Sequence, residues 1–227
     1  METARIAELL EPYLTRPRPA SAGKQQTLTQ DQLKYISIYI NILLRWNSRI
    51  NLTAVREPEE IVRRHFGESL FTALYLFPEV DDQPPTHIID VGSGAGFPGL
   101  PIKLWFPHAR VTLIESNHKK AAFLREVIRA ITLTAINVFS GRAEDYEESP
   151  GHVVTLRAVE KFATTLPTAT ELVAPGGRLA LLIGESQCQK AKGLKPLLQW
   201  DDAVGLPSSL NRVLLIGTKN LTEKESE

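Results

Sequence analysis

The sequence predicts an α/β protein: a doubly wound, Rossmann-like sheet, mostly parallel with an antiparallel edge strand, plus an N-terminal helical cap. Three observations indicate this class. Before about residue 80 the apolar residues recur at helical spacing, whereas after residue 86 short β-rich runs alternate with helices, as in βαβ units. The first β-rich run also ends in a glycine-rich turn. We therefore expect residues 1–80 to form the cap and residues 81–227 the sheet domain, in one compact unit.

Composition sets limits on the class of protein. The 227 residues include 26 Lys and Arg against 26 Asp and Glu, with 43% hydrophobic and 23% charged residues. This is typical of a globular domain and excludes a disordered or collagen-like chain. With zero net charge, any affinity for nucleic acid must come from local patches. The single cysteine, Cys188, excludes an intrachain disulfide.

The chain shows neither the apolar core of a secretion signal nor an apolar run long enough for a membrane helix. We therefore expect a cytoplasmic, monomeric protein that does not bind a membrane.

Three helices are expected in the cap. Residues 1–14 carry apolar side chains at helical spacing. Thr29 and Gln32 form a capping box that starts a helix over about 29–47. Pro58 suits the first turn of a third helix over about 58–77.

The sheet domain is expected to begin with a buried strand and to end with an antiparallel pair. A helix is predicted over 119–133, with one apolar face. The last strand follows a possible partner around Val204 after a polar segment too short for a helix, which indicates antiparallel pairing. The predicted strands are 87–91, 110–115, 136–139, 153–156, 177–183 and 213–218.

The glycine-rich turn after the first strand is the strongest signal of a binding site. Residues 88–99 read Ile-Ile-Asp-Val-Gly-Ser-Gly-Ala-Gly-Phe-Pro-Gly. Glycines let a backbone turn tightly and approach a ligand, and the helix that follows offers free N–H groups. Such a turn binds a nucleotide-like ligand at the carboxyl end of the strand. A plain tight turn is the alternative, but it needs fewer glycines.

The fingerprint of dinucleotide-binding proteins fits this turn poorly. Counted from Gly92, Phe97 stands where the third glycine should be, and a match from Gly94 to Gly99 is displaced from the strand. The Gly-Lys-Ser/Thr of a phosphate-binding loop is also absent from the sequence. A dehydrogenase is therefore a weak alternative.

The form Asp90-x-Gly92-x-Gly94-x-Gly96 resembles motif I of class I S-adenosylmethionine-dependent methyltransferases. The resemblance implies S-adenosyl-L-methionine as cofactor. Glu115, about twenty residues on at the end of the second strand, could accept both ribose hydroxyls; a solvated acid is the alternative. In this superfamily, residues after the third strand usually contact the adenine, and here these are 142–145.

The methyl acceptor leaves its marks after the fourth strand. The Asn/Asp-Pro-Pro-aromatic motif of adenine amino-group methylation is absent there, where the sequence reads Thr155-Leu156-Arg157. Cys188 lies in a polar segment beyond the fifth strand, which disfavours a cysteine nucleophile for pyrimidine methylation. Ring nitrogens, hydroxyls and small molecules remain. Guanine N7 is compatible, because its lone pair requires no general base.

Four segments together resemble the bacterial ribosomal RNA small subunit methyltransferase G family, also called glucose-inhibited division protein B. They are Trp46-Asn47 with Asn51-Leu52-Thr53, then residues 64–69, then Asp90 to Pro101, and Leu156-Arg157-Ala158. The resemblance implies methylation of guanine N7 at the equivalent of position 527 in 16S rRNA, with the rRNA or the small ribosomal subunit as partner. Gly67 and Glu68 depart from the Leu-Asp that the family commonly has.

The resemblance also implies site residues. On this chain the cofactor contacts would be Gly92, Phe97, Ala143, Glu144 and Arg157, to which the residue pattern itself adds Ser93, Gly94, Gly96 and Glu115. No catalytic base and no metal are expected. Candidate RNA-binding residues are Arg64, His65, Lys119, Lys120 and Arg212.

Each of these residues has a plainer alternative. The basic residues could be ordinary solvated charges, and Arg157 could simply pair with Glu68. Two other functions also stay open: a methyltransferase for a small molecule or protein, and a non-catalytic RNA-binding module.

Overall fold

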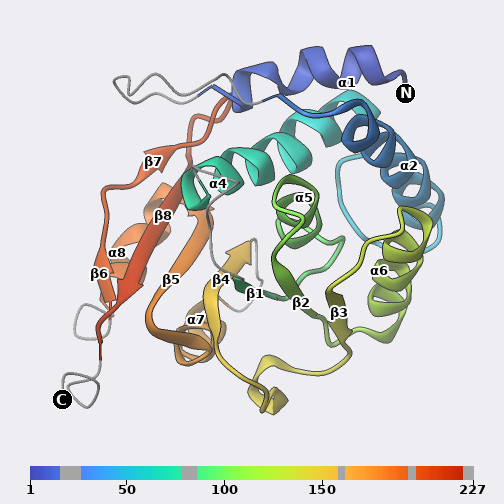
Figure 1. Ribbon diagram of the computed structural model, residues 1–227. Coiled ribbons are helices and arrows are strands. Elements are labelled where there is room, and N and C mark those ends of the chain that lie inside the picture. The colour runs from blue at the N-terminus through green and yellow to red at the C-terminus, as the bar shows by residue number, and fades with distance from the viewer. Residues whose placement is uncertain (16–26, 78–85, 158–161, 194–197, 222–227) are drawn as a thin grey trace.

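The computed structural model describes residues 1–15, 27–77, 86–157, 162–193 and 198–221. Helices α1 (Thr3–Leu10), α2 (Gln30–Asn47), α3 (Pro58–Ile61) and α4 (Glu68–Leu76) form the cap, which lies over one end of the sheet (Figure 1). The predicted boundary at residue 80 lies outside the described residues.

The capping box predicted for α2 is confirmed. The Thr29 hydroxyl accepts a hydrogen bond from the Gln32 N–H at 3.2 Å, and the Gln32 side chain accepts one from the Thr29 N–H at 2.7 Å. These contacts satisfy N–H groups that the first turn of a helix leaves free.

The third cap helix runs without a break from Pro58 to Leu76, as predicted, but its middle turn is π-helical. Residues Val62–Gly67 form a π-helix between α3 and α4. In this turn the Arg64 carbonyl accepts from the Arg157 side chain at 2.8 Å, and the His65 carbonyl accepts from the Ser69 hydroxyl at 2.6 Å. Side chains thus donate hydrogen bonds to backbone carbonyls of the π-turn. Such π-helical turns are frequent at functional sites.

The sheet has the order β3-β2-β1-β4-β5-β8-β6, and β7 also pairs with β8. Strands β1 to β5 are parallel and β8 is antiparallel to β5, which confirms the predicted fold class. The bounds are β1 His87–Val91, β2 Arg110–Ile114, β3 Ile136–Phe139, β4 Gly151–Arg157, β5 Val173–Gly184, β6 Leu198–Trp200, β7 Val204–Gly205 and β8 Arg212–Lys219.

The antiparallel strand β8 is not itself the edge of the sheet. The short strand β6 pairs with its outer side along with β7, and β6 was not predicted because three residues are too few to show an alternating pattern.

Helices cover both faces of the sheet. They are α5 Gly99–Trp105, α6 His118–Ala130, α7 Phe162–Glu171 and α8 Cys188–Lys192, with 3-10 turns at Glu11–Tyr13, Ala143–Asp145 and Glu185–Gln187. One apolar cluster joins the cap helices to α5, α6 and one face of the sheet, and a second lies on the other face with α7. None of the described helices combines the length and the apolarity needed to span a bilayer.

Candidate functional site

The glycine turn lies at the carboxyl end of β1, in the middle of the sheet. Gly92, Gly94 and Gly96 have φ angles of 68°, 56° and 86°, a region that side chains disfavour. A Cβ on Gly96 would also lie 2.5 Å from both Leu100 Cδ1 and Tyr39 Oη. A Cβ on Gly94 would meet only the Gly92 carbonyl, at 3.8 Å, among the described residues. Free space therefore adjoins the backbone at Gly94, as a ligand cradle requires.

Asp90 ties the turn to its surroundings. Its buried carboxylate accepts hydrogen bonds from the Thr155 hydroxyl of β4 at 2.6 Å and from the Gly99 N–H of α5 at 3.3 Å. Burial raises the pKa of Asp90 to about 6, although these hydrogen bonds act in the opposite direction. The acid of the motif thus holds β1, β4 and α5 together beneath the turn.

Glu115 lies beside the turn at the end of β2. It is only 7% exposed; one carboxylate oxygen accepts from the Gly94 N–H at 2.8 Å and the other from the Asn117 N–H at 2.7 Å. The sequence predicted that Glu115 lies near the glycine turn, because neighbouring parallel strands end at the same edge of the sheet. The burial does not fit the alternative of a solvated acid.

Phe97 is the centre of an aromatic cluster that joins the turn to the cap. Its ring stacks on Tyr39 of α2 at a centroid distance of 5.4 Å and on His65 of the π-turn at 4.9 Å, and it meets Phe66 edge-on at 5.1 Å. The Tyr39 hydroxyl donates to the Ala95 carbonyl. The cap therefore fixes the shape of the turn through side chains from two of its elements.

A buried ion-pair network lies next to this cluster. Glu68 of α4 is 2% exposed, and its carboxylate pairs with Arg157 at the end of β4 at 2.9 Å and with Arg212 at the start of β8. This is the contact that sequence reasoning set against a ligand role for Arg157. A role in holding the cofactor or base remains a prediction for Arg157, and RNA binding remains one for Arg212.

His65 is part of the same network and is neutral. Burial, followed by the charges of Arg157, Arg64 and Arg212, lowers its pKa to about 2. Arg157 donates to its Nδ1 at 3.1 Å, so the proton is on Nε2, which donates to the Thr53 hydroxyl at 2.7 Å. His65 is thus held as a neutral imidazole between Arg157 and Thr53, and its contact with RNA remains a prediction.

The remaining predicted residues lie around this centre. Ala143, buried, and Glu144, exposed, form a 3-10 turn after β3. Arg64 and Lys119 are exposed and Lys120 is half-buried. The last two follow Asn117, whose side chain accepts from both of their N–H groups.

Sequence reasoning missed Tyr39, Thr53 and Thr155 as parts of the site. Tyr39 continues the apolar spacing of α2 one turn after Ile36, and Thr155 lies opposite Asp90 in the β1–β4 register. Those two positions could have been found from the predicted elements. The contact of Thr53 with His65 depends on the π-turn, which the sequence does not announce.

Comparison with known proteins assigns the sequence to a family. Residues 32–208 match the profile of the family described as rRNA small subunit methyltransferase G. The chain belongs to the rRNA small subunit methyltransferase G family. All the predicted site residues except Arg212 lie within the matched range.

Individual members of the rRNA small subunit methyltransferase G family agree with this assignment. The protein of Roseiflexus castenholzii is 42% identical over 156 residues, which cover 66% of this chain and 64% of that protein. That of Halorhodospira halophila is 40% identical over 161 residues, which cover 71% and 74%. For two Roseiflexus relatives the match spans less than two thirds of their length.

Solved structures at low sequence identity show the same fold. TYW2 of P. horikoshii in complex with MeSAdo has a TM-score of 0.55 at 16% identity, and the match covers 68% of this chain and 62% of that one. The fibrillarin/Nop5p complex has a TM-score of 0.55 at 10% identity, with 68% and 82% covered. This chain thus has the same fold as these two solved structures.

Proposed function

We propose that this chain transfers a methyl group from S-adenosyl-L-methionine to N7 of a guanine in the 16S rRNA of the small ribosomal subunit. The observation that carries the proposal is the joined turn and carboxylate: Gly94 and Glu115, 21 positions apart, meet at 2.8 Å beside free space. The family assignment of residues 32–208 supports the acceptor.

The residues present fit the cofactor. The Glu115 carboxylate is an acceptor suited to ribose hydroxyls at the strand end. Open space adjoins the backbone at Gly94, Gly92, Ser93 and Gly96 would complete the cradle, and Ala143 with Glu144 would border the adenine. The cofactor supplies an electrophilic methyl group; the chain's task is to hold it in line with the attacking nitrogen.

Guanine N7 suits a site without an acid–base pair. N7 has a lone pair and no proton to lose, so positioning and control of charge are sufficient in principle. The titratable groups at the site are engaged in structure: Asp90 binds Thr155 and Gly99, and His65 is neutral. Arg157 is fixed by three acceptors, the Arg64 carbonyl, His65 and Glu68.

An arginine bonded to both O6 and N7 is the usual way to recognise guanine, but it would cover the reacting lone pair. We therefore infer that any arginine contact uses O6 alone or stacking. The target guanine must also be exposed before N7 can reach the methyl group. We further propose that the chain acts as a monomer, in the cytoplasm, on the rRNA or the small subunit.

A methyl-transfer assay tests the proposal. The purified chain is incubated with methyl-labelled S-adenosylmethionine and small subunits that lack the modification, with large subunits as the control. Label in small-subunit rRNA alone is the expected result. Cofactor binding without labelled RNA would favour a small-molecule or protein methyltransferase, and absence of cofactor binding would contradict the interpretation of the glycine turn.

A further inference from the structure

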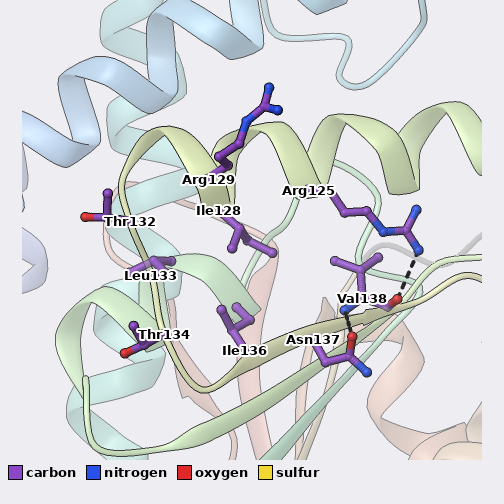
Figure 2. Close-up of a pocket in the computed structure, with 9 residues that line it drawn as sticks. All are labelled: Arg125, Ile128, Arg129, Thr132, Leu133, Thr134, Ile136, Asn137 and Val138. Atoms are coloured by element: carbon purple, nitrogen blue, oxygen red, sulfur yellow. Dashed lines mark hydrogen bonds between the residues drawn. The ribbon is translucent and has the colours of Figure 1, made fainter.

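A second candidate binding site lies at the edge of the sheet, away from the network around Arg157. It is an open pocket between the C-terminal half of α6 and the edge strand β3 (Figure 2). Arg125 and Arg129 project from the helix, and Asn137 and Val138 lie on the strand. The described lining also contains Thr132 and Thr134 but no carboxylate. Ile128, Leu133 and Ile136 make part of the lining apolar, but its two charged side chains are both cationic, so a charged ligand here would be an anion.

Both arginines leave guanidinium N–H donors available to a ligand. Arg125 donates from one Nη to the Val138 carbonyl at 3.2 Å, which orients the side chain across the pocket while a guanidinium has five N–H donors in all. Both side chains belong to exposed residues. Among the described residues, neither has a carboxylate within ion-pair distance.

The adjoining strand edge is closed to another strand at this point. The Val138 N–H is bonded to the Asn137 side chain at 2.8 Å, and its carbonyl to Arg125. Since a partner strand would need these backbone groups, recognition here falls to side chains.

Helix α6 concentrates positive charge in a chain whose net charge is zero. Its 13 residues hold four lysines and arginines and one carboxylate. That carboxylate, Glu126, is already bonded to Arg45 and, at 2.9 Å, to Trp46 of α2. The cations lie at both ends of the helix: Lys119 and Lys120 near Glu115 at the cofactor site, and Arg125 and Arg129 at the pocket.

We propose that α6 and this pocket bind the phosphate backbone of RNA, with Arg125 and Arg129 as phosphate contacts remote from the methyl-transfer centre. Lys119 and Arg129 are ten residues apart, about 15 Å along the helix, so the pocket would be a phosphate contact separate from the cofactor site. A guanidinium group can donate two parallel hydrogen bonds to the oxygens of one phosphate. Such contacts position an RNA without reading its sequence. The proposal rests on the proposed function in its choice of RNA.

The carbonyl end of α6 carries a partial negative charge. It would weaken anion binding by the backbone, so the arginine side chains must supply the attraction. Their removal is therefore the sharp test.

The test compares the double variant Arg125→Gln/Arg129→Gln with Lys190→Gln/Lys192→Gln on α8. Both variants remove two positive charges. Helix α8 lies near β6, at the opposite end of the sheet from α6 and β3 (Figure 1). Affinity for an unmodified 16S rRNA fragment and for the unmodified small subunit is measured at several salt concentrations. Affinity for S-adenosylmethionine is measured by calorimetry.

Two lost phosphate contacts lower the salt slope of log K by about 1.4 to 1.8. Between about 0.05 and 0.2 M salt, the affinity of the wild type should thus fall roughly tenfold more than that of the arginine variant. The α8 variant should behave as wild type, and cofactor affinity should be unchanged in both.

Three results would overturn the proposal: an unchanged slope in the arginine variant, equal loss in both variants, or weaker binding to the small subunit with normal binding to the naked fragment, which would indicate a protein partner. The proposed function fails separately, if the wild type binds this RNA but methylates neither it nor unmodified small subunits. A wild type that does not bind RNA at all would overturn both.

Discussion

The Glu68 network allows a stability prediction with a matched control. Replacing Glu68 by Gln keeps the size of the side chain but removes the charge between Arg157 and Arg212. The side chains of Glu68 and Arg157 are 2% and 6% exposed, and breaking a buried pair so that one charge stays uncompensated costs about 3 to 5 kcal/mol. Gln retains one acceptor oxygen, so we expect the lower end, about 3 kcal/mol.

The control is Glu59→Gln. Glu59 also bridges two arginines, Arg5 at 2.8 Å and Arg63 at 3.0 Å, but its side chain is 42% exposed. Exposed pairs contribute little because water screens them, so its loss should have a much smaller effect. Urea unfolding measures both variants, as a fall in midpoint at constant slope. Equal midpoints for the two variants would refute the reasoning from burial.

Three further predictions concern the turn and its neighbours. Thr53→Val leaves the His65 Nε2–H without its acceptor and should lower the free energy of unfolding by about 1 to 3 kcal/mol, which Thr53→Ser should restore. Because the pKa of His65 is lowered in the folded protein, its contribution to stability is present above about pH 6.5 and is lost as the pH falls. The His65 ring should therefore show no NMR titration between about pH 5 and 8. Gly96→Ala places a Cβ against Leu100 at a φ of 86° and should lower the free energy of unfolding in urea by more than about 2 kcal/mol. The control Gly205→Ala has open space around the new Cβ and should leave that free energy nearly unchanged. Glu115→Gln weakens two charge-assisted hydrogen bonds and should lower cofactor affinity about tenfold or more by calorimetry; unchanged affinity would contradict the assignment.

Local sequence signals predicted short apolar strands that are bounded by turn residues. The strand His87–Val91 and the strand Ile136–Phe139 were predicted with their observed bounds, because short apolar runs flanked by turn residues are typical of strands in a parallel sheet. The short β6 and the helix α7 were missed. The former has too few residues for a pattern, and α7 contains Pro167, which argues against a helix in any local reading.

The site could be predicted only where chain topology dictates it. Glu115 and the glycine turn meet because adjacent parallel strands end together. The Glu68–Arg212 pair joins positions 144 residues apart. The antiparallel last strand was predicted, but the π-turn that precedes Glu68 was not, and no local pattern indicates which acid pairs with Arg212. The partner of a charge depends on packing between distant elements, so sequence reasoning left ion pair and ligand contact as alternatives for Arg157.

The most direct test is the identity of the methylated nucleoside. Small-subunit rRNA labelled by the purified chain is digested to nucleosides, identified by mass spectrometry, and mapped on the RNA. We expect 7-methylguanosine at the equivalent of position 527. Label in a methylated adenine or pyrimidine would contradict it, because the site offers neither the motif nor the nucleophile that those reactions need.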